Sequence, residues 1–406
     1  MIRLNRPNKI AYISSFAPRR CGIATFTSDL IRHTHRASEG VFEPVVVAMQ
    51  SDPSQQFREP VQYVIRQQVR SDYMEVADSI NSSNIEVVSL QHEFGLFGGP
   101  GGSYIVPMLR RLMMPVISTL HTILEKPLPA YFQSMVNVCD CSDKIVVMNK
   151  RGIEMLRNVY GVPMRKIELI PHGIPDVPFG QADYYKCRLG LRGRKVLLTF
   201  GLIGPNKGIE VMLSAMPLIV RENPDAVYLI VGTTHPEIVK KQGYAYMKWL
   251  QKLVVDFGLE DHVVFYDKFI TQSELNDFLA ASDIFVTPYM NKEQLTSGTL
   301  AFAVGSGKAV VSTPYWAAEE LLAEGRGVLI PFGDPLRMAE GINRIFGGEL
   351  SKNLMMRRAY RYGRSMTWPK IGQAYWNIFG ATKAFLRTSA HSQLSIHAST
   401  GIACNP

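Results

Sequence analysis

The chain has 406 residues, of which 46% are hydrophobic and 19% charged, and its formal net charge at pH 7 is +9. This composition excludes a collagen, a coiled coil and a wholly disordered chain, and the length predicts two or three domains. The charge is local, because residues 351–406 contain eight basic residues and no acidic residue, whereas the rest of the chain is almost neutral.

The first half of the chain alternates short apolar runs with longer helical patterns. Five runs are strand candidates, at residues 9–16, 44–49, 85–91, 115–121 and 144–149. Because these runs are continuously apolar, they indicate parallel strands that are covered on both faces. The first run is too short for a secretory signal or a membrane span, and five scattered cysteines lack zinc-site spacing. We therefore expect a cytoplasmic protein with reduced thiols.

Several strand ends in this half carry residues suited to ligand binding. The turn after the first strand leads into a helix N-terminus, which can bind an anion or a sugar hydroxyl, although taken alone this turn favours a structural role. After the third strand, a histidine and a glutamate precede five glycines in eight positions, a pattern typical of a loop that moves or contacts a ligand. The candidates are Gly22, His92, Glu93, Phe94, Gly95 and His121.

A second α/β pattern follows a break. Three prolines and two glycines in residues 171–180 predict a linker. Six new strand candidates come after it, at residues 195–201, 226–232, 262–266, 283–288, 309–313 and 327–331. Two doubly wound units joined by a hinge are the simplest interpretation, and a cleft between them is the expected ligand site.

Two helix N-termini in the second half have the features of phosphate sites. The first strand is followed by Gly204, Asn206 and Lys207, where a lysine adds its charge to backbone N–H groups and the helix dipole. The fourth strand is followed by a helix of small residues that begins at Thr296, Ser297, Gly298 and Thr299. Its N–H groups form a second candidate cluster for phosphate oxygens.

Together these motifs resemble those of glycosyltransferase family 4 (group 1), retaining enzymes of the GT-B fold with two facing Rossmann-like domains. The Gly22 loop is similar to the family's first glycine-rich loop, and His121 to its active-site histidine. Residues 170–174 resemble the segment before the interdomain linker, and 307–311 resemble the end of the family's donor-binding motif. The resemblance covers residues 8–387. It implies an N-terminal acceptor-side domain at 1–176, a linker at 177–194, a nucleotide-sugar domain at 195–365, a helix that packs back on the first domain at 366–387 and a disordered tail at 388–406.

The sequence departs from the family pattern at the donor site. Leu202 stands where the family has an arginine, whereas Lys207 is kept. Gln294 and Phe302 stand where the family has two glutamates, and Glu293, one residue away, is positioned to take the role of the first.

The resemblance implies a retaining, metal-independent hexosyltransferase without a cofactor. Its co-substrate would be a nucleoside diphosphate sugar, such as GDP-mannose or UDP-glucose, and its acceptor a glycan or glycolipid hydroxyl. The implied catalytic residues are His121, Lys207 and Glu293. The implied donor contacts are Gly22, Gly204, Asn206, Lys207, Gln294, Thr296, Ser297, Gly298 and Thr299, and the implied acceptor-side contacts are His92, Glu93, Phe94 and Gly95. A GT-B-fold glycoside phosphorylase and a non-catalytic sugar-nucleotide-binding protein are alternatives, whereas an NAD oxidoreductase is disfavoured because the glycine fingerprint is incomplete.

The cationic end precedes and enters a final amphipathic helix. Its apolar face carries Ile371, Tyr375, Ile378, Phe379, Phe385 and Leu386. Just before it, Arg357, Arg358, Arg361 and Arg364 are candidates for contact with an anionic membrane at its inner face, with an acidic glycan or with water alone. No aromatic-basic motif accompanies them, so we do not expect nucleic acid as a partner.

Overall fold

A computed structural model describes residues 8–399 of the chain, with side chains up to residue 383 apart from Glu237. The chain divides into two units, of which the second is continuous from His172 to Thr367. The first unit combines the residues before His172 with those after Thr367. Within the described residues, no helix combines the length and the apolar character needed to cross a membrane.

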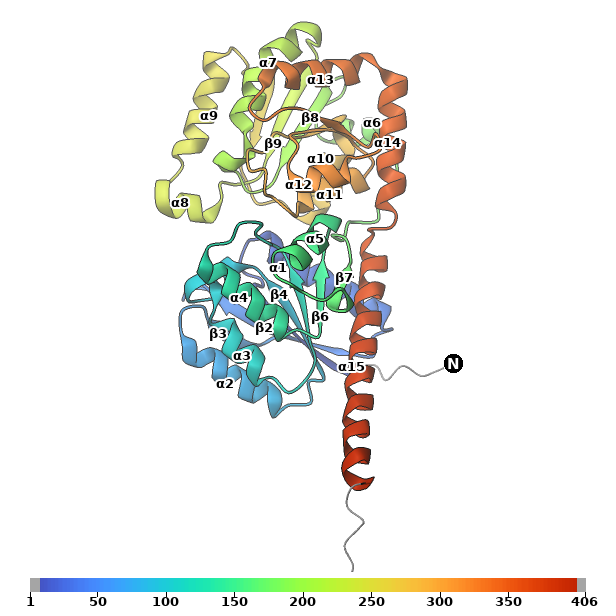
Figure 1. The fold of residues 1–406 in the computed structure, drawn as a ribbon. Helices are drawn as coiled ribbons and strands as arrows, with labels where there is room; N and C mark the ends of the chain where they lie inside the picture. The colour runs from blue at the N-terminus through green and yellow to red at the C-terminus, as the bar shows by residue number, and fades with distance from the viewer. Residues whose placement is uncertain (1–7, 400–406) are drawn as a thin grey trace, which may run out of the picture. The chain divides into compact units, whose positions relative to one another are not determined.

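The first unit contains a parallel sheet of seven strands in the order β3-β2-β1-β4-β5-β6-β7 (Figure 1). Five of them match the predicted strands, whereas the two edge strands β3 and β7 were not predicted. The edge positions explain this, because β3 is partly exposed along its length and β7 has only three residues, so neither has a continuous apolar run. The strands are β1 Lys9–Ser14, β2 Glu43–Gln50, β3 Val61–Arg66, β4 Val87–His92, β5 Val116–Leu120, β6 Lys144–Val147 and β7 Ile167–Leu169.

Helices cover this sheet, and the last helix of the chain is one of them. Along the chain they are α1 Gly22–Ala37, α2 Arg70–Asn81, α3 Ile105–Arg111, α4 Pro129–Asp140, α5 Lys150–Asn158 and α15 Trp368–Ser399. Helix α15 packs lengthwise on α1, and the core there includes Trp368, Ile371, Tyr375, Trp376 and Phe379. This confirms most of the predicted apolar face, while the side chains of Phe385 and Leu386 lie outside the described residues.

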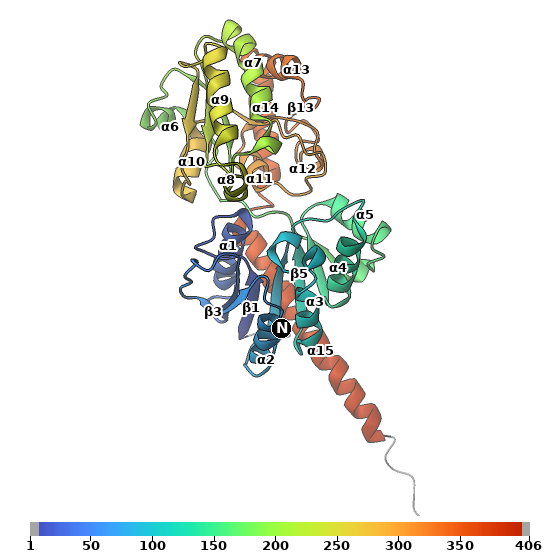
Figure 2. The same cartoon turned by 90° about the vertical axis from the view of Figure 1, so that its left-hand side faces the viewer.

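Helix α15 continues past residue 387 to Ser399, and its last turns extend beyond the sheet and the other helices of the unit in both views (Figures 1 and 2). Most of the residues after Thr388 are small or polar, but neither glycine nor proline occurs among them before Gly401. No helix breaker therefore ends the helix at the predicted position. Residues 400–406 of the predicted tail lie outside the described residues.

The second unit contains a parallel sheet of six strands in the order β10-β9-β8-β11-β12-β13. All six match predicted strands: β8 Lys195–Phe200, β9 Ala226–Val231, β10 Val263–Tyr266, β11 Ile284–Thr287, β12 Ala309–Ser312 and β13 Val328–Leu329. Separate apolar cores lie on the two faces of the sheet. The helices are α6 Ala182–Arg188, α7 Ile209–Glu222, α8 Pro236–Gln242, α9 Ala245–Asp256, α10 Gln272–Ala281, α11 Gly298–Gly305, α12 Trp316–Leu321, α13 Pro335–Gly347 and α14 Glu349–Gly363. Helix α6 lies inside the segment predicted as a linker.

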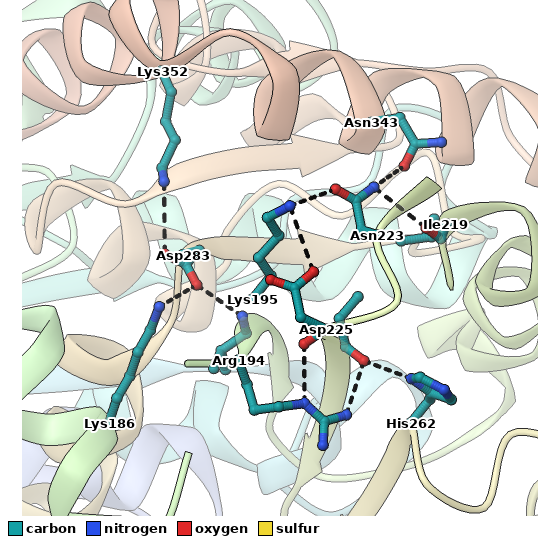
Figure 3. Close-up of polar contacts among 12 residues, drawn as sticks. Lys186, Arg194, Lys195, Ile219, Asn223, Asp225, His262, Asp283, Asn343 and Lys352 are labelled. Carbon is teal, nitrogen blue, oxygen red and sulfur yellow. Dashed lines mark hydrogen bonds and ion pairs between the residues drawn. The ribbon is translucent and has the colours of Figure 1, made fainter. Parts of the chain in front are cut away.

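A network of hydrogen bonds and ion pairs lies at the N-terminal ends of the strands of this second sheet (Figure 3). The Asp283 carboxylate, just before β11, accepts hydrogen bonds from Lys186 Nζ (2.7 Å) and from Val196 N (2.8 Å), and Lys352 Nζ lies 3.6 Å from it. Arg194 donates to three carbonyl oxygens, those of Asp225, Ala226 and Asp261. These cations are bound to structural partners, so ligand binding has to be sought at the carboxyl end of the strands.

Candidate functional site

Lys207 lies at the carboxyl end of β8, in a short 3₁₀ turn, Pro205–Lys207, that leads into α7. Gly208 follows with φ +61°, and a Cβ on it would lie 2.0 Å from the carbonyl oxygen of Pro288, so only glycine fits there. The half-buried Lys207 ammonium lies 3.8 Å from the ring centroid of Tyr289. Among the side chains that the structure describes, no carboxylate oxygen lies within 4.0 Å of it. Burial lowers the Lys207 pKa to about 8, so Lys207 is still protonated in most molecules at pH 7.

The N-terminus of α11 lies beside this turn. Ser297 is its N-cap, and its Oγ accepts a hydrogen bond from Leu300 N (3.3 Å). Thr299 Oγ1 lies 2.9 Å from the Tyr289 hydroxyl, and its Cγ2 would be 3.4 Å from a Cβ on Gly201. The first N–H groups of a helix have no partner within the helix, so those of Gly298 and Thr299 can bind an anion close to Lys207.

The other predicted donor residues take different places. A Cβ on Gly204 would lie 2.4 Å from Ile238 Cδ1, so this glycine lies against a side chain of α8. The carbonyl of Asn206 accepts a hydrogen bond from Met290 N (3.0 Å). Gln294 Nε2 donates to the carbonyl of Thr296 (3.1 Å) and orders the loop before α11. Glu293 is exposed, and its carboxylate makes no hydrogen bond or ion pair within the described residues.

In the first unit, His121 and the Gly22 loop lie at the carboxyl ends of β5 and β1. His121 is half-buried, its Nε2 donates to Gln91 Oε1 (3.0 Å), and its ring packs edge-on against Phe26 with centroids 5.0 Å apart. Gly22 is the exposed first residue of α1, and a Cβ on it would have no atom within 4 Å. A ligand can therefore approach the N-terminus of α1 there.

The predicted acceptor residues split into buried and accessible ones. His92 is completely buried, with its ring stacked on Phe97, and burial lowers its pKa to about 4. Phe94 is also buried, whereas Gly95 is exposed. Glu93 is half-buried and accepts a short hydrogen bond from the Thr122 hydroxyl, while burial raises its carboxyl pKa. Only Glu93 and Gly95 are thus accessible to an acceptor, because the rings of the other two belong to the core.

The glycines that follow have structural roles. A Cβ on Gly98 would lie 2.1 Å from the carbonyl oxygen of Gln67, and one on Gly102 would lie 2.7 Å from that of Phe94. Gly99 and Gly101 have positive φ values of 80° and 59°. Close approach of backbone atoms at Gly98, Gly101 and Gly102, and the positive φ of Gly99, explain why glycine is needed at these four positions.

Comparison with known proteins finds a family likeness in the second unit, where residues 194–347 match the family model described as Glycosyl transferases group 1. We call residues 194–347, which are similar to that family, the group 1 domain. The helix N-terminus of α11 and the Lys207 turn both lie within this group 1 domain.

The chain is also similar in sequence to curated proteins. Mannosylfructose-phosphate synthase of Agrobacterium fabrum is 27% identical over 241 residues, which are 57% of this chain and 51% of that protein. The GDP-mannose-dependent alpha-(1-6)-phosphatidylinositol monomannoside mannosyltransferase of Mycolicibacterium smegmatis is 26% identical over 165 residues, 40% of each chain. The chain thus spans about half the length, or less, of these curated relatives.

Solved structures resemble the chain over more of its length. HepE of Anabaena in complex with UDP has a TM-score of 0.74 at 17% identity, with 92% of this chain and 100% of that chain covered. Sucrose-phosphate synthase of Thermosynechococcus elongatus has a TM-score of 0.72 at 18% identity, with 92% and 100% covered. The predicted GT-B fold is confirmed.

His172 adjoins the group 1 domain at the start of α11 and was not predicted as a site residue. Its Nδ1 donates to the carbonyl of Gly173 (2.8 Å), and a Cβ on Gly298 would lie 2.9 Å from its Nε2. Burial lowers the His172 pKa to about 4, so the ring is neutral at pH 7. The ring of Phe302, at the position of the family's second glutamate, packs edge-on against it with centroids 5.8 Å apart. In the sequence His172 lies within the pattern at residues 171–180 that predicted a linker, and nothing in that pattern indicates its contact with α11.

Proposed function

We propose that the chain is a retaining glycosyltransferase that moves a hexosyl unit, mannosyl or glucosyl, from a nucleoside diphosphate sugar to a glycan or glycolipid hydroxyl. The observation that supports this most directly is the Lys207 ammonium, which lies beside the N-terminus of α11 and has no carboxylate partner among the described side chains. A partly buried cation without a counter-charge is costly, and a diphosphate would supply that charge.

The same groups have a role in the chemistry. Negative charge grows on the leaving diphosphate as the glycosidic bond breaks, and Lys207 with the N–H groups of Gly298 and Thr299 would stabilise it. The β-phosphate would accept the proton of the acceptor hydroxyl, so transfer with retention would need no protein nucleophile. In this scheme the positive charge comes from Lys207 and the helix dipole, and we assign no step to a metal ion.

The remaining roles are divided between accessible and supporting residues. We assign donor-sugar and acceptor contacts to Gly22, His121, Glu93 and Gly95. His92 and Phe94 would support that loop from inside the core. Gln294 and Thr296 would hold the loop before α11, and the exposed Glu293 would be free to turn toward the donor sugar.

Thermal unfolding with UDP, GDP and ADP, and with their mannose and glucose derivatives, tests the donor. Two relatives suggest where to begin, since one is named as GDP-mannose-dependent and the other was solved with UDP. A nucleotide at 100 times its Kd should raise the free energy of unfolding by about 2.7 kcal/mol. Stabilisation by none of them would contradict the proposal. Binding without transfer to any acceptor would favour the non-catalytic alternative, and sugar release that needs inorganic phosphate would favour a phosphorylase.

We also propose that the outer face of α14 contacts anionic lipid headgroups at the inner face of the membrane. Leu350 and Leu354 are 78% and 50% exposed, and the exposed Arg357 and Arg361 continue the same stripe at helical spacing. Vesicles that contain phosphatidylglycerol should sediment the protein at low salt and less of it at high salt. Arg357→Gln with Arg361→Gln should weaken this binding, whereas Arg337→Gln, on α13 and paired with Glu340, should not. No sedimentation at low salt would exclude the contact.

A further inference from the structure

The segment that enters the second unit runs along α11. We call residues 172–179 the strap. His172 lies against Gly298 at the start of α11, as described above. At the other end of the helix, a Cβ on Gly305 would lie 2.0 Å from Ile174 Cδ1. Just beyond the helix, a Cβ on Gly307 would lie 2.8 Å from the ring of Phe179. The strap therefore touches both ends of the helix whose N-terminus is the candidate anion site.

Arg364, immediately after α14, joins the strap to the C-terminal end of α11. One of its guanidinium nitrogens forms an ion pair with Asp176 of the strap, and another donates to the carbonyl oxygen of Gly305 (2.7 Å). The guanidinium also stacks on the ring of Tyr360 at 3.9 Å from its centroid. The Tyr360 hydroxyl donates in turn to the carbonyl of Val177 (3.0 Å). Arg364, predicted from the sequence as one of four surface arginines, is thus an internal connector.

Helix α14 also packs directly against α11. A Cβ on Gly363 would lie 2.5 Å from the Cα of Gly305, so the two backbones are in contact. The strap is also bound to the segment that follows α14, because Ile174 N donates to the carbonyl of Met366 (2.9 Å). The C-terminal end of α11 is therefore held by the strap, by α14 and by Arg364.

We propose that Arg364 is a positioning residue for the diphosphate site, an inference that rests on the proposed function. Helix α11 has eight residues, so its two ends are about 12 Å apart and move as one rigid body. A cation that binds the last carbonyl of the helix also reinforces the dipole whose positive end faces the diphosphate. Arg364 binds the last carbonyl of α11 and so reinforces its dipole. Through its ion pair with Asp176 it also links the C-terminal end of α11 to the strap.

Calorimetric titration at a temperature where every variant is folded tests this role, with two ligands: the nucleoside diphosphate that binds in the thermal screen and the corresponding nucleoside without phosphates. Arg364→Gln should weaken diphosphate binding about tenfold and leave nucleoside binding unchanged, because only the phosphates contact α11. Arg364→Lys should recover part of the loss, since it keeps the charge without the two-pronged geometry. Asp176→Asn should give a smaller loss of the same kind. Arg344→Gln, at an exposed arginine of α13 to which no role is assigned, should have no effect.

The outcomes separate this inference from the proposed function. If Lys207→Ala abolishes diphosphate binding but Arg364→Gln leaves it unchanged, the site stands and the role of Arg364 is wrong. If Arg364→Gln weakens diphosphate and nucleoside equally, its effect is general destabilisation and the positioning role is also wrong. If the wild type binds no nucleoside diphosphate, the proposed function fails and this inference fails with it.

Discussion

Replacing Lys207 with alanine should lower kcat/KM for glycosyl transfer roughly 100- to 1,000-fold, a loss of about 3 to 4 kcal/mol of transition-state stabilisation. The reason is that its ammonium lies beside the N-terminus of α11 and has no carboxylate partner among the side chains that the structure describes. A leaving diphosphate would therefore lose a positive side chain close to it. Initial rates at varied donor concentration measure the effect. Lys248→Ala, at an exposed lysine of α9, is the matched control and should behave as the wild type.

The pH dependence of the wild type gives a second test of the same residue. Because burial lowers the Lys207 pKa to about 8, kcat/KM should fall above pH 8 as the free enzyme loses this charge. Lys207→Arg should extend the active range to higher pH, since a guanidinium stays protonated there. Turnover of Lys207→Ala close to that of Lys248→Ala, or a wild-type profile that stays flat well above pH 8, would contradict the assignment.

Replacing Gly372 with alanine should destabilise the first unit by about 1 to 3 kcal/mol. In α15 the added Cβ would lie 2.4 Å from the backbone carbon and oxygen of His33 in α1, and 2.8 Å from Thr34 N. Backbone atoms cannot turn aside, so the two helices would have to separate along a contact that includes Trp368 and Trp376. Denaturant unfolding followed by tryptophan fluorescence measures the loss.

The control for Gly372→Ala is the same substitution at a helical glycine with free space. A Cβ on Gly347, at the end of α13, would have no atom within 4 Å, and its φ is not positive. Gly347→Ala should therefore be neutral or should stabilise by up to about 1 kcal/mol, because alanine favours the helix. Equal unfolding free energies for the two variants would show that α1 and α15 do not pack as closely as described.

The sequence allowed most of the fold to be predicted, because buried parallel strands leave continuous apolar runs. All six strands of the second unit and the five inner strands of the first were predicted on that basis. β3 and β7 were not predicted because an edge strand is partly exposed or short and has no such run. The apolar face of α15 could also be predicted, because its apolar residues recur at helical spacing.

The site could be predicted only where local chemistry and local geometry coincide. Lys207 and Ser297–Thr299 each lie at the junction of a strand and a helix, and the structure brings these two junctions together. The glycines at 98–102 serve packing, which depends on Gln67 and Phe94 and thus on contacts that a local pattern does not contain. His172 and Arg364 depend in the same way on α11, a helix more than fifty residues away from either of them in the sequence.

The place of α15 in the first unit has a consequence for biosynthesis. The second unit is continuous in sequence, so it can fold as soon as residue 367 has left the ribosome. Most of the first unit is made earlier, but it lacks Trp368, Ile371, Tyr375, Trp376 and Phe379 until the second unit has been synthesised. Until then the apolar face of α1 that later receives them is uncovered, and a nascent or truncated chain ending before residue 368 would be prone to aggregation or to chaperone binding.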